Sequence, residues 1–99
     1  ASTTEEVIFS KANKQADMPS LIYNNAKKPY IFWSHHSDAD GGIYFSWQKR
    51  NGQWQSIKTA LEKPQSVMWA RAMIDSNNIA HLVWANDFQE IYYTWGKIE

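Results

Sequence analysis

The chain has 99 residues and no cysteine, and its ten basic and ten acidic side chains balance to a formal net charge of zero. This length fits one ordinary domain, and the balance of charge predicts neither nucleic acid nor a membrane as a partner. The lack of cysteine excludes disulfides and thiolate chemistry. No apolar run approaches the roughly 20 residues of a membrane span, and no segment has the pattern of a signal peptide.

Aromatic residues dominate the composition. Six Trp, five Tyr and four Phe stand beside only four Gly and three Pro. Aromatic side chains at this density favour pleated, packed surfaces.

The first half of the chain predicts a series of short strands. A strand is expected at residues 5–11, and a polar turn at Asn24 to Lys28 leads into a strand at Tyr30 to Trp33. The loop "SHHSDADG" follows, and then a strand at Ile43 to Trp47. The "NG" pair at positions 51 and 52 supplies turn chemistry before a further strand at Gln53 to Ala60.

The second half repeats the first. The segment "YNNAKKPYIFW" (23–33) aligns without a gap with "IDSNNIAHLVW" (74–84), and "GGIYFSW" (41–47) returns 48 residues later as "QEIYYTW" (89–95). The second copy therefore has a turn at Asp75 to Asn78, a strand at His81 to Trp84, the loop "ANDFQ" and a strand that ends at Trp95. Such a period points to a repeat architecture.

A unit of short antiparallel strands repeated about every 48 residues predicts two four-stranded β-propeller blades, at about 19–61 and 67–96. Both faces of the repeated strands are apolar, so each sheet needs a cover on both sides. A β-sandwich is the alternative. Two blades cannot close a ring, so the chain either oligomerises or is part of a longer protein, and the strand at 5–11 is expected to complete a blade.

The strand and turn motifs resemble the blades of sialidase-like propellers. The resemblance rests on "KPYIFW" and "IAHLVW", on "IYFSW" and "IYYTW", and on the turn "NGQW". In that family the turn often carries an Asp-box, whereas "SWQKRNGQW" keeps its Ser, Gly and Trp and lacks its Asp. The resemblance implies that catalysis would need an arginine cluster and a Tyr–Glu pair. Arg50 and Arg71 are the only arginines, so no catalytic residue and no enzymatic activity is predicted.

A second resemblance concerns assembly. Some small fucose-binding lectins have two blades per chain and form trimers with six blades, and this similarity implies a homo-oligomer, with a trimer expected. The sugar-binding Arg and Glu positions of those lectins are not matched by "YIFW" or "IYFSW". Their sugar specificity is therefore not carried over.

The candidate ligand site lies on the loops and strand ends expected at one end of the blades. Polar and aromatic residues together suit a sugar, whose ring stacks on Trp while its hydroxyls meet polar groups. The ligand-binding candidates are Trp69, His35, His36, Asp38, Asp87 and Arg71. The Asp38–Gly42 stretch has too few ligands for Ca²⁺, so neither a metal nor another cofactor is predicted. The four tryptophans that recur with the period, and His81 inside a strand, are expected to pack in the interior.

Carbohydrate binding by a lectin-like propeller is the leading functional hypothesis. A structural or protein-interaction propeller, natural or engineered, and a fragment of a glycoside hydrolase are the alternatives. The chain start without Met fits a processed secreted protein, a tag remnant or a fragment, so localisation stays open, with a secreted or extracellular place slightly favoured.

Overall fold

Two antiparallel sheets make up the described part of the chain. The computed structural model describes residues 8, 16–35, 41–62, 67–85 and 90–98. The strands are β1 (Ala16–Tyr23), β2 (Pro29–His35), β3 (Gly42–Trp47), β4 (Lys58–Glu62), β5 (Met68–Ile74), β6 (Ile79–Ala85) and β7 (Ile91–Lys97). The first sheet has the order β1-β2-β3-β4 and the second the order β5-β6-β7. The all-β prediction is confirmed, and none of the described residues forms a helix that could span a membrane.

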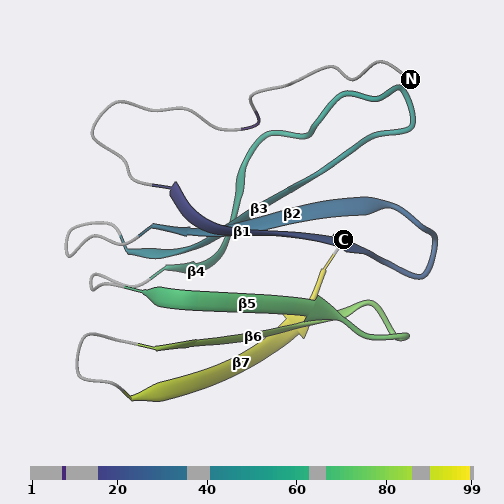
Figure 1. Ribbon diagram of the computed structural model, residues 1–99. Coiled ribbons are helices and arrows are strands. Elements are labelled where there is room, and N and C mark those ends of the chain that lie inside the picture. Colours follow the sequence, from purple (N-terminus) through teal and green to yellow (C-terminus); the bar gives the residue numbers. More distant parts are fainter. Residues whose placement is uncertain (1–7, 9–15, 36–40, 63–66, 86–89, 99) are drawn as a thin grey trace, which may run out of the picture.

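The two sheets stack as layers. In Figure 1 the first sheet lies above β5, and β6 and β7 follow below it. The strands β1 and β2 of the first sheet lie against β5 of the second. The strand expected at residues 5–11 lies outside the described residues, apart from residue 8. The blade limits of 19–61 and 67–96 stay a prediction.

The backbone repeats together with the sequence. Met18 and Trp69 both have a positive φ, 52° and 49°, and both lie in a bulge where the first strand of a sheet shifts register against the second. In the next turns Lys27 and Asn78 have φ values of 61° and 60°. Non-glycine residues seldom adopt this region, so the two sheets share one local structure at a spacing of 51 residues.

The turn before the second strand of each sheet has the same chemistry. Asn24 Oδ1 accepts the backbone N–H groups of the residues two and four positions later, both at 2.9 Å. Asp75 Oδ1 does the same at 2.8 and 3.1 Å. The first turn also reaches the second, because the Asn25 amide side chain donates to the Ser76 carbonyl oxygen. Asx turns of this kind form locally, and for this reason both turns could be predicted.

The fourth strand begins later than predicted. The turn at Asn51 and Gly52 closes tightly, with an isolated bridge between Gln48 and Trp54. The chain then runs beside the end of β3, where the Gln55 N–H donates to the Trp47 carbonyl oxygen at 2.8 Å and the Ser46 hydroxyl donates to the Gln55 carbonyl oxygen at 2.7 Å. Pairing with β3 as β4 starts at Lys58 and not at position 53, because this connection takes up the intervening residues.

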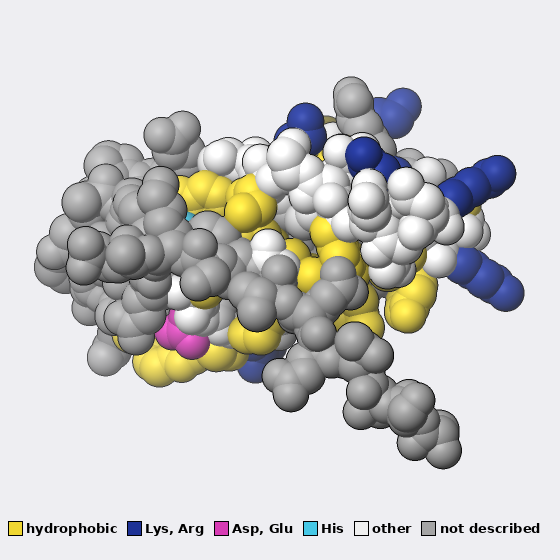
Figure 2. Space-filling view, turned by 90° about the horizontal axis from the view of Figure 1, so that it is seen from above, with side chains coloured by type: hydrophobic (Ala, Val, Ile, Leu, Met, Phe, Trp, Pro, Cys, Tyr) yellow, Lys and Arg dark blue, Asp and Glu magenta, His cyan; other side chains and the backbone are white. Residues whose placement is uncertain are grey.

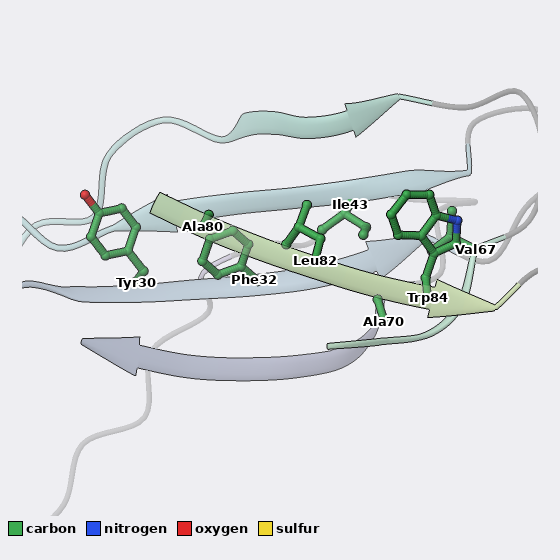
Figure 3. Packing of buried hydrophobic residues seen from close by; sticks show 8 residues of the cluster. All are labelled: Tyr30, Phe32, Ile43, Val67, Ala70, Ala80, Leu82 and Trp84. Carbon is green, nitrogen blue, oxygen red and sulfur yellow. The ribbon is translucent and has the colours of Figure 1, made fainter. Parts of the chain in front are cut away.

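The core fills the space between the two sheets. Phe32 of the first sheet and Leu82 and Trp84 of the second are each at most 4% exposed, and Figure 3 shows Phe32 close to Leu82 between the ribbons. The rings of Phe32 and Phe45 stack with centroids 5.3 Å apart. The buried cluster consists of Tyr30, Phe32, Ile43, Val67, Ala70, Ala80, Leu82 and Trp84. Burial of these apolar side chains is the main force that holds the sheets together.

Candidate functional site

The second sheet leaves one face uncovered by the first sheet. This face, called the open face below, is defined by the cross-strand rows Arg71–Val83–Tyr93 and Met73–His81–Trp95, with Ile91 beside them. Trp95 is 62% exposed, so the expectation that all four recurring tryptophans pack in the interior is wrong for this residue. Exposed apolar patches of this kind mark interaction sites.

A shallow groove of about 340 Å³ runs over the open face. Met73 and Val83 form its apolar floor together with Tyr93. Its polar groups are Arg71, Asp75 and His81, from β5, the following turn and β6.

His81 links a turn to a neighbouring strand across this groove. Its Nε2 lies 2.8 Å from Asp75 Oδ2, and its Nδ1 lies 2.7 Å from the Tyr93 hydroxyl. The His81 and Tyr93 rings also stack, with centroids 5.9 Å apart. The His81 side chain is 28% exposed, so its predicted place in the interior is wrong: it faces away from the first sheet.

The carboxylate of Asp75 is held in its charged form. The hydrogen bond with His81 is the largest cause that keeps the pKa of Asp75 below its ordinary value, and the backbone N–H of Ile79 acts in the same direction. Hydrogen bonds to a charged carboxylate stabilise that form. The network therefore fixes His81 and can offer hydrogen bonds to a polar ligand in the groove.

Trp69 and Arg71 lie at the start of β5, in and next to the bulge. The Trp69 side chain is 62% exposed, whereas the next residue, Ala70, is buried. Arg71 is also exposed, and its Nη1 lies 3.5 Å from the carbonyl oxygen of Ala70. Two of the predicted ligand-binding residues therefore lie close together on the surface.

His35 lies elsewhere. It ends β2 on the face of the first sheet that points away from the second, is 5% exposed, and stacks on Tyr44 with centroids 4.3 Å apart. Its Nε2 accepts a hydrogen bond from Trp33 Nε1 at 3.3 Å. The structure thus places His35 and Trp69 on different sheets and different faces. The predicted ligand residues His36, Asp38 and Asp87 lie outside the described residues.

Basic side chains gather at the opposite end of the sheets, where the β1–β2 turn lies. Figure 2 shows Lys and Arg side chains projecting together at one end, and Lys27, Lys28, Lys49 and Arg50 line one shallow pocket there. The Lys28 ammonium lies 4.6 Å from the centre of the Trp47 ring, a cation–π contact. This contact and the one with the Tyr30 ring, at 5.4 Å, hold the Lys28 ammonium in place.

The Asp75–His81–Tyr93 network was missed in the sequence analysis. The aligned repeats contain a signal for it, because Asp75 and His81 stand where the first copy has Asn24 and Tyr30. Two polar pairs at matched positions indicate a contact between the turn and the strand.

Comparison with known proteins adds no assignment: no family model, curated protein or solved structure matches this chain. The function is therefore inferred from the site itself.

Proposed function

We propose that the chain binds carbohydrate and that the indole ring of Trp69 is the surface on which a sugar stacks. The observation that carries this proposal is the 62% exposure of Trp69 within a strand. The equivalent residue of the first sheet, Met18, has the same backbone conformation but is partly buried. It lines a small space beside Ala70 and Arg71 of the second sheet. An exposed indole at such a position offers a flat apolar face, which suits the C–H face of a sugar ring.

Arg71 supplies polar groups next to this ring. Its guanidinium carries five N–H donors in a planar arrangement, and the side chain is exposed two positions along β5 from Trp69. Sugar hydroxyl and carboxylate oxygens are matching acceptors. Stacking and hydrogen bonding thus come from two residues that are two positions apart on one strand.

The proposed role is binding and not catalysis. Glycoside hydrolysis generally needs two carboxyl groups that flank the scissile bond. Asp75 is the one carboxylate among the described residues that line the groove, and its Oδ2 is engaged by His81. Because this network lowers the pKa of Asp75, the carboxyl group stays ionised and has no proton to donate as a general acid.

We also propose that the two sheets are neighbouring blades of a β-propeller, completed by further copies of the chain. Three facts support this arrangement: the sheets are antiparallel, they stack face to face, and they share the bulge and the turn at a constant spacing. A propeller is built by such radial repetition of similar sheets.

A glycan array probed with the labelled 99-residue chain tests the proposed carbohydrate binding. The chain is expected to bind a limited set of glycans, and Trp69→Ala is expected to weaken that binding about tenfold or more, which corresponds to about 1.4 kcal/mol. Trp69→Phe keeps an aromatic face and should retain most of the affinity. Because Trp69 is exposed, both variants should fold.

Two results would contradict the proposal. One is the absence of glycan binding by the parent chain over the whole array. The other is equal binding by the parent and by Trp69→Ala, which would place any sugar site elsewhere.

A further inference from the structure

The open face is the repeat equivalent of a surface that is already covered inside the chain. By the aligned repeats, Met73, His81, Val83, Tyr93 and Trp95 correspond to Ile22, Tyr30, Phe32, Phe45 and Trp47. All five residues of the first sheet belong to the core or pack against it, on the side of β5–β7. The five on the second sheet include four of the large hydrophobic residues that are exposed.

The face of the second sheet that packs on the first sheet also has an equivalent in the first sheet, and this equivalent is exposed. Ala72 and Ile74 of β5 pack against the core from the second sheet. Their equivalents in β1 are Leu21 and Tyr23, which are 59% and 57% exposed. Leu21 and Tyr23 alternate with the core-facing Ile22, so they lie on the outer face of the first sheet.

The contact between the two sheets therefore joins unlike faces. The inner face of the first repeat packs on the back of the second, so the inner face of the second sheet stays open. On the back of the first sheet, the strip formed by Leu21 and Tyr23 stays exposed. An interface of this heterologous kind continues from unit to unit, and it gives a ring where the rotation between units closes. Continuity with the interface inside the chain identifies the missing cover as another first sheet.

We infer that a second copy of this chain docks on the open face, with Leu21 and Tyr23 of its β1 seated over the groove formed by Met73, His81 and Val83. The inference rests on the propeller arrangement proposed above and does not depend on carbohydrate binding. In such a contact, the open face of one chain and the exposed Leu21 and Tyr23 of the next chain cover each other.

Side-chain sizes on the two open surfaces complement each other. In the groove, Val83 replaces the larger Phe32 of the first sheet. On the incoming strand, Leu21 and Tyr23 replace the smaller Ala72 and Ile74. Volume is lost on one side and gained on the other, which is the direction that an interface packed to interior density requires.

The polar groups of the groove fit the same occupant. A tyrosine hydroxyl that becomes buried usually finds a hydrogen-bond partner. The turn end of the groove holds Asp75 and His81, and Tyr23 lies at the turn end of β1. The Asp75–His81 pair is already hydrogen-bonded, so covering it does not leave an isolated charge.

Complementary surface variants test the head-to-tail contact. Val83→Lys puts a charge in the groove, and Leu21→Lys puts one on the incoming strand. The parent chain is expected to form a closed oligomer by sedimentation and light scattering at micromolar concentration without sugar, and each variant alone is expected to be a monomer. An equimolar mixture should give a one-to-one heterodimer, because one intact groove then meets one intact strand.

This mixing experiment separates the inference from other assemblies. A dimer formed by two open faces would be unaffected by Leu21→Lys and would not be rescued by mixing. Either that pattern or a monomeric parent chain would overturn the inference. Circular dichroism checks the fold of each variant, and Met73→Lys with Tyr23→Lys provides a second pair. Because Arg71 lines the same groove, the glycan array is run on the parent chain and on Leu21→Lys, so that sugar binding is measured with and without assembly.

Discussion

His81 and Asp75 form the same link between turn and strand as Tyr30 and Asn24 do, but with ionisable groups. Nε2 of His81 lies 2.8 Å from Oδ2 of Asp75. In the first sheet, burial raises the pKa of Tyr30, and a hydrogen bond with the Asn24 side chain partly offsets the rise. The link with Asn24 lies in the covered sheet and contains no carboxylate, whereas the link on the open face contains the carboxylate of Asp75, so only the second link loses a charged acceptor in acid.

Replacing Asp75 with Asn is expected to reduce the loss of stability in acid. The pKa of Asp75 is held below its ordinary value of 3.8 in the folded chain, mainly by the hydrogen bond with His81. A lowered folded pKa stabilises the protein above the unfolded value, and this contribution disappears as the pH falls through the folded pKa. The free energy of unfolding of the parent should therefore fall more steeply below about pH 4 than that of Asp75→Asn.

Urea unfolding followed by tryptophan fluorescence at neutral pH and at several acidic values measures this difference. Asn is compatible with the turn, because Asn24 makes the same backbone hydrogen bonds in the first sheet. Parallel curves of stability against pH for the two proteins would show that the Asp75 carboxylate has no net role.

Two tryptophans on opposite faces of the second sheet should differ sharply in their effect on stability. Trp84 is 4% exposed and stacks on Tyr92, whereas Trp95 is 62% exposed. Trp84→Ala should lower the free energy of unfolding by about 3–5 kcal/mol. Trp95→Ala should cost less than about 1 kcal/mol. Both are measured in the Val83→Lys background, so that assembly does not contribute. Equal losses would mean that Trp95 packs inside the single chain.

Two glycines in strands should respond in opposite ways to alanine. A Cβ at Gly42 would overlap the backbone carbonyl oxygen of Leu61, in the ladder between β3 and β4. Backbone atoms in a ladder cannot yield easily, so Gly42→Ala should destabilise the chain by about 1–3 kcal/mol. A Cβ at Gly96 meets no atom within 4 Å, and Gly96→Ala should be neutral or stabilising by about 0.5 kcal/mol. Thermal unfolding of the two variants tests the contrast, and equal melting temperatures would contradict it.

The sequence by itself determined the elements that form through local chemistry. The turns at Asn24 and Asp75 follow from side chains that bond their own backbone, and the strands after them follow from alternating apolar residues. The internal repeat also predicted correctly that the two halves have related strands. The start of β4 could not be predicted, because residues 53–57, which the pattern assigns to a strand, bond to the end of β3 outside a regular ladder.

Only the tertiary structure decided which apolar face is covered. Tyr30 and His81 occupy equivalent positions, as do Trp47 and Trp95, yet the first of each pair packs in or against the core while the second lies on the open face. Alternation identifies the two faces of a strand but carries no information about which face has another layer against it. For the candidate site, the sequence indicated Trp69 and Arg71, whereas the link from Asp75 through His81 to Tyr93 depends on strand register, which pairs residues that are distant along the chain.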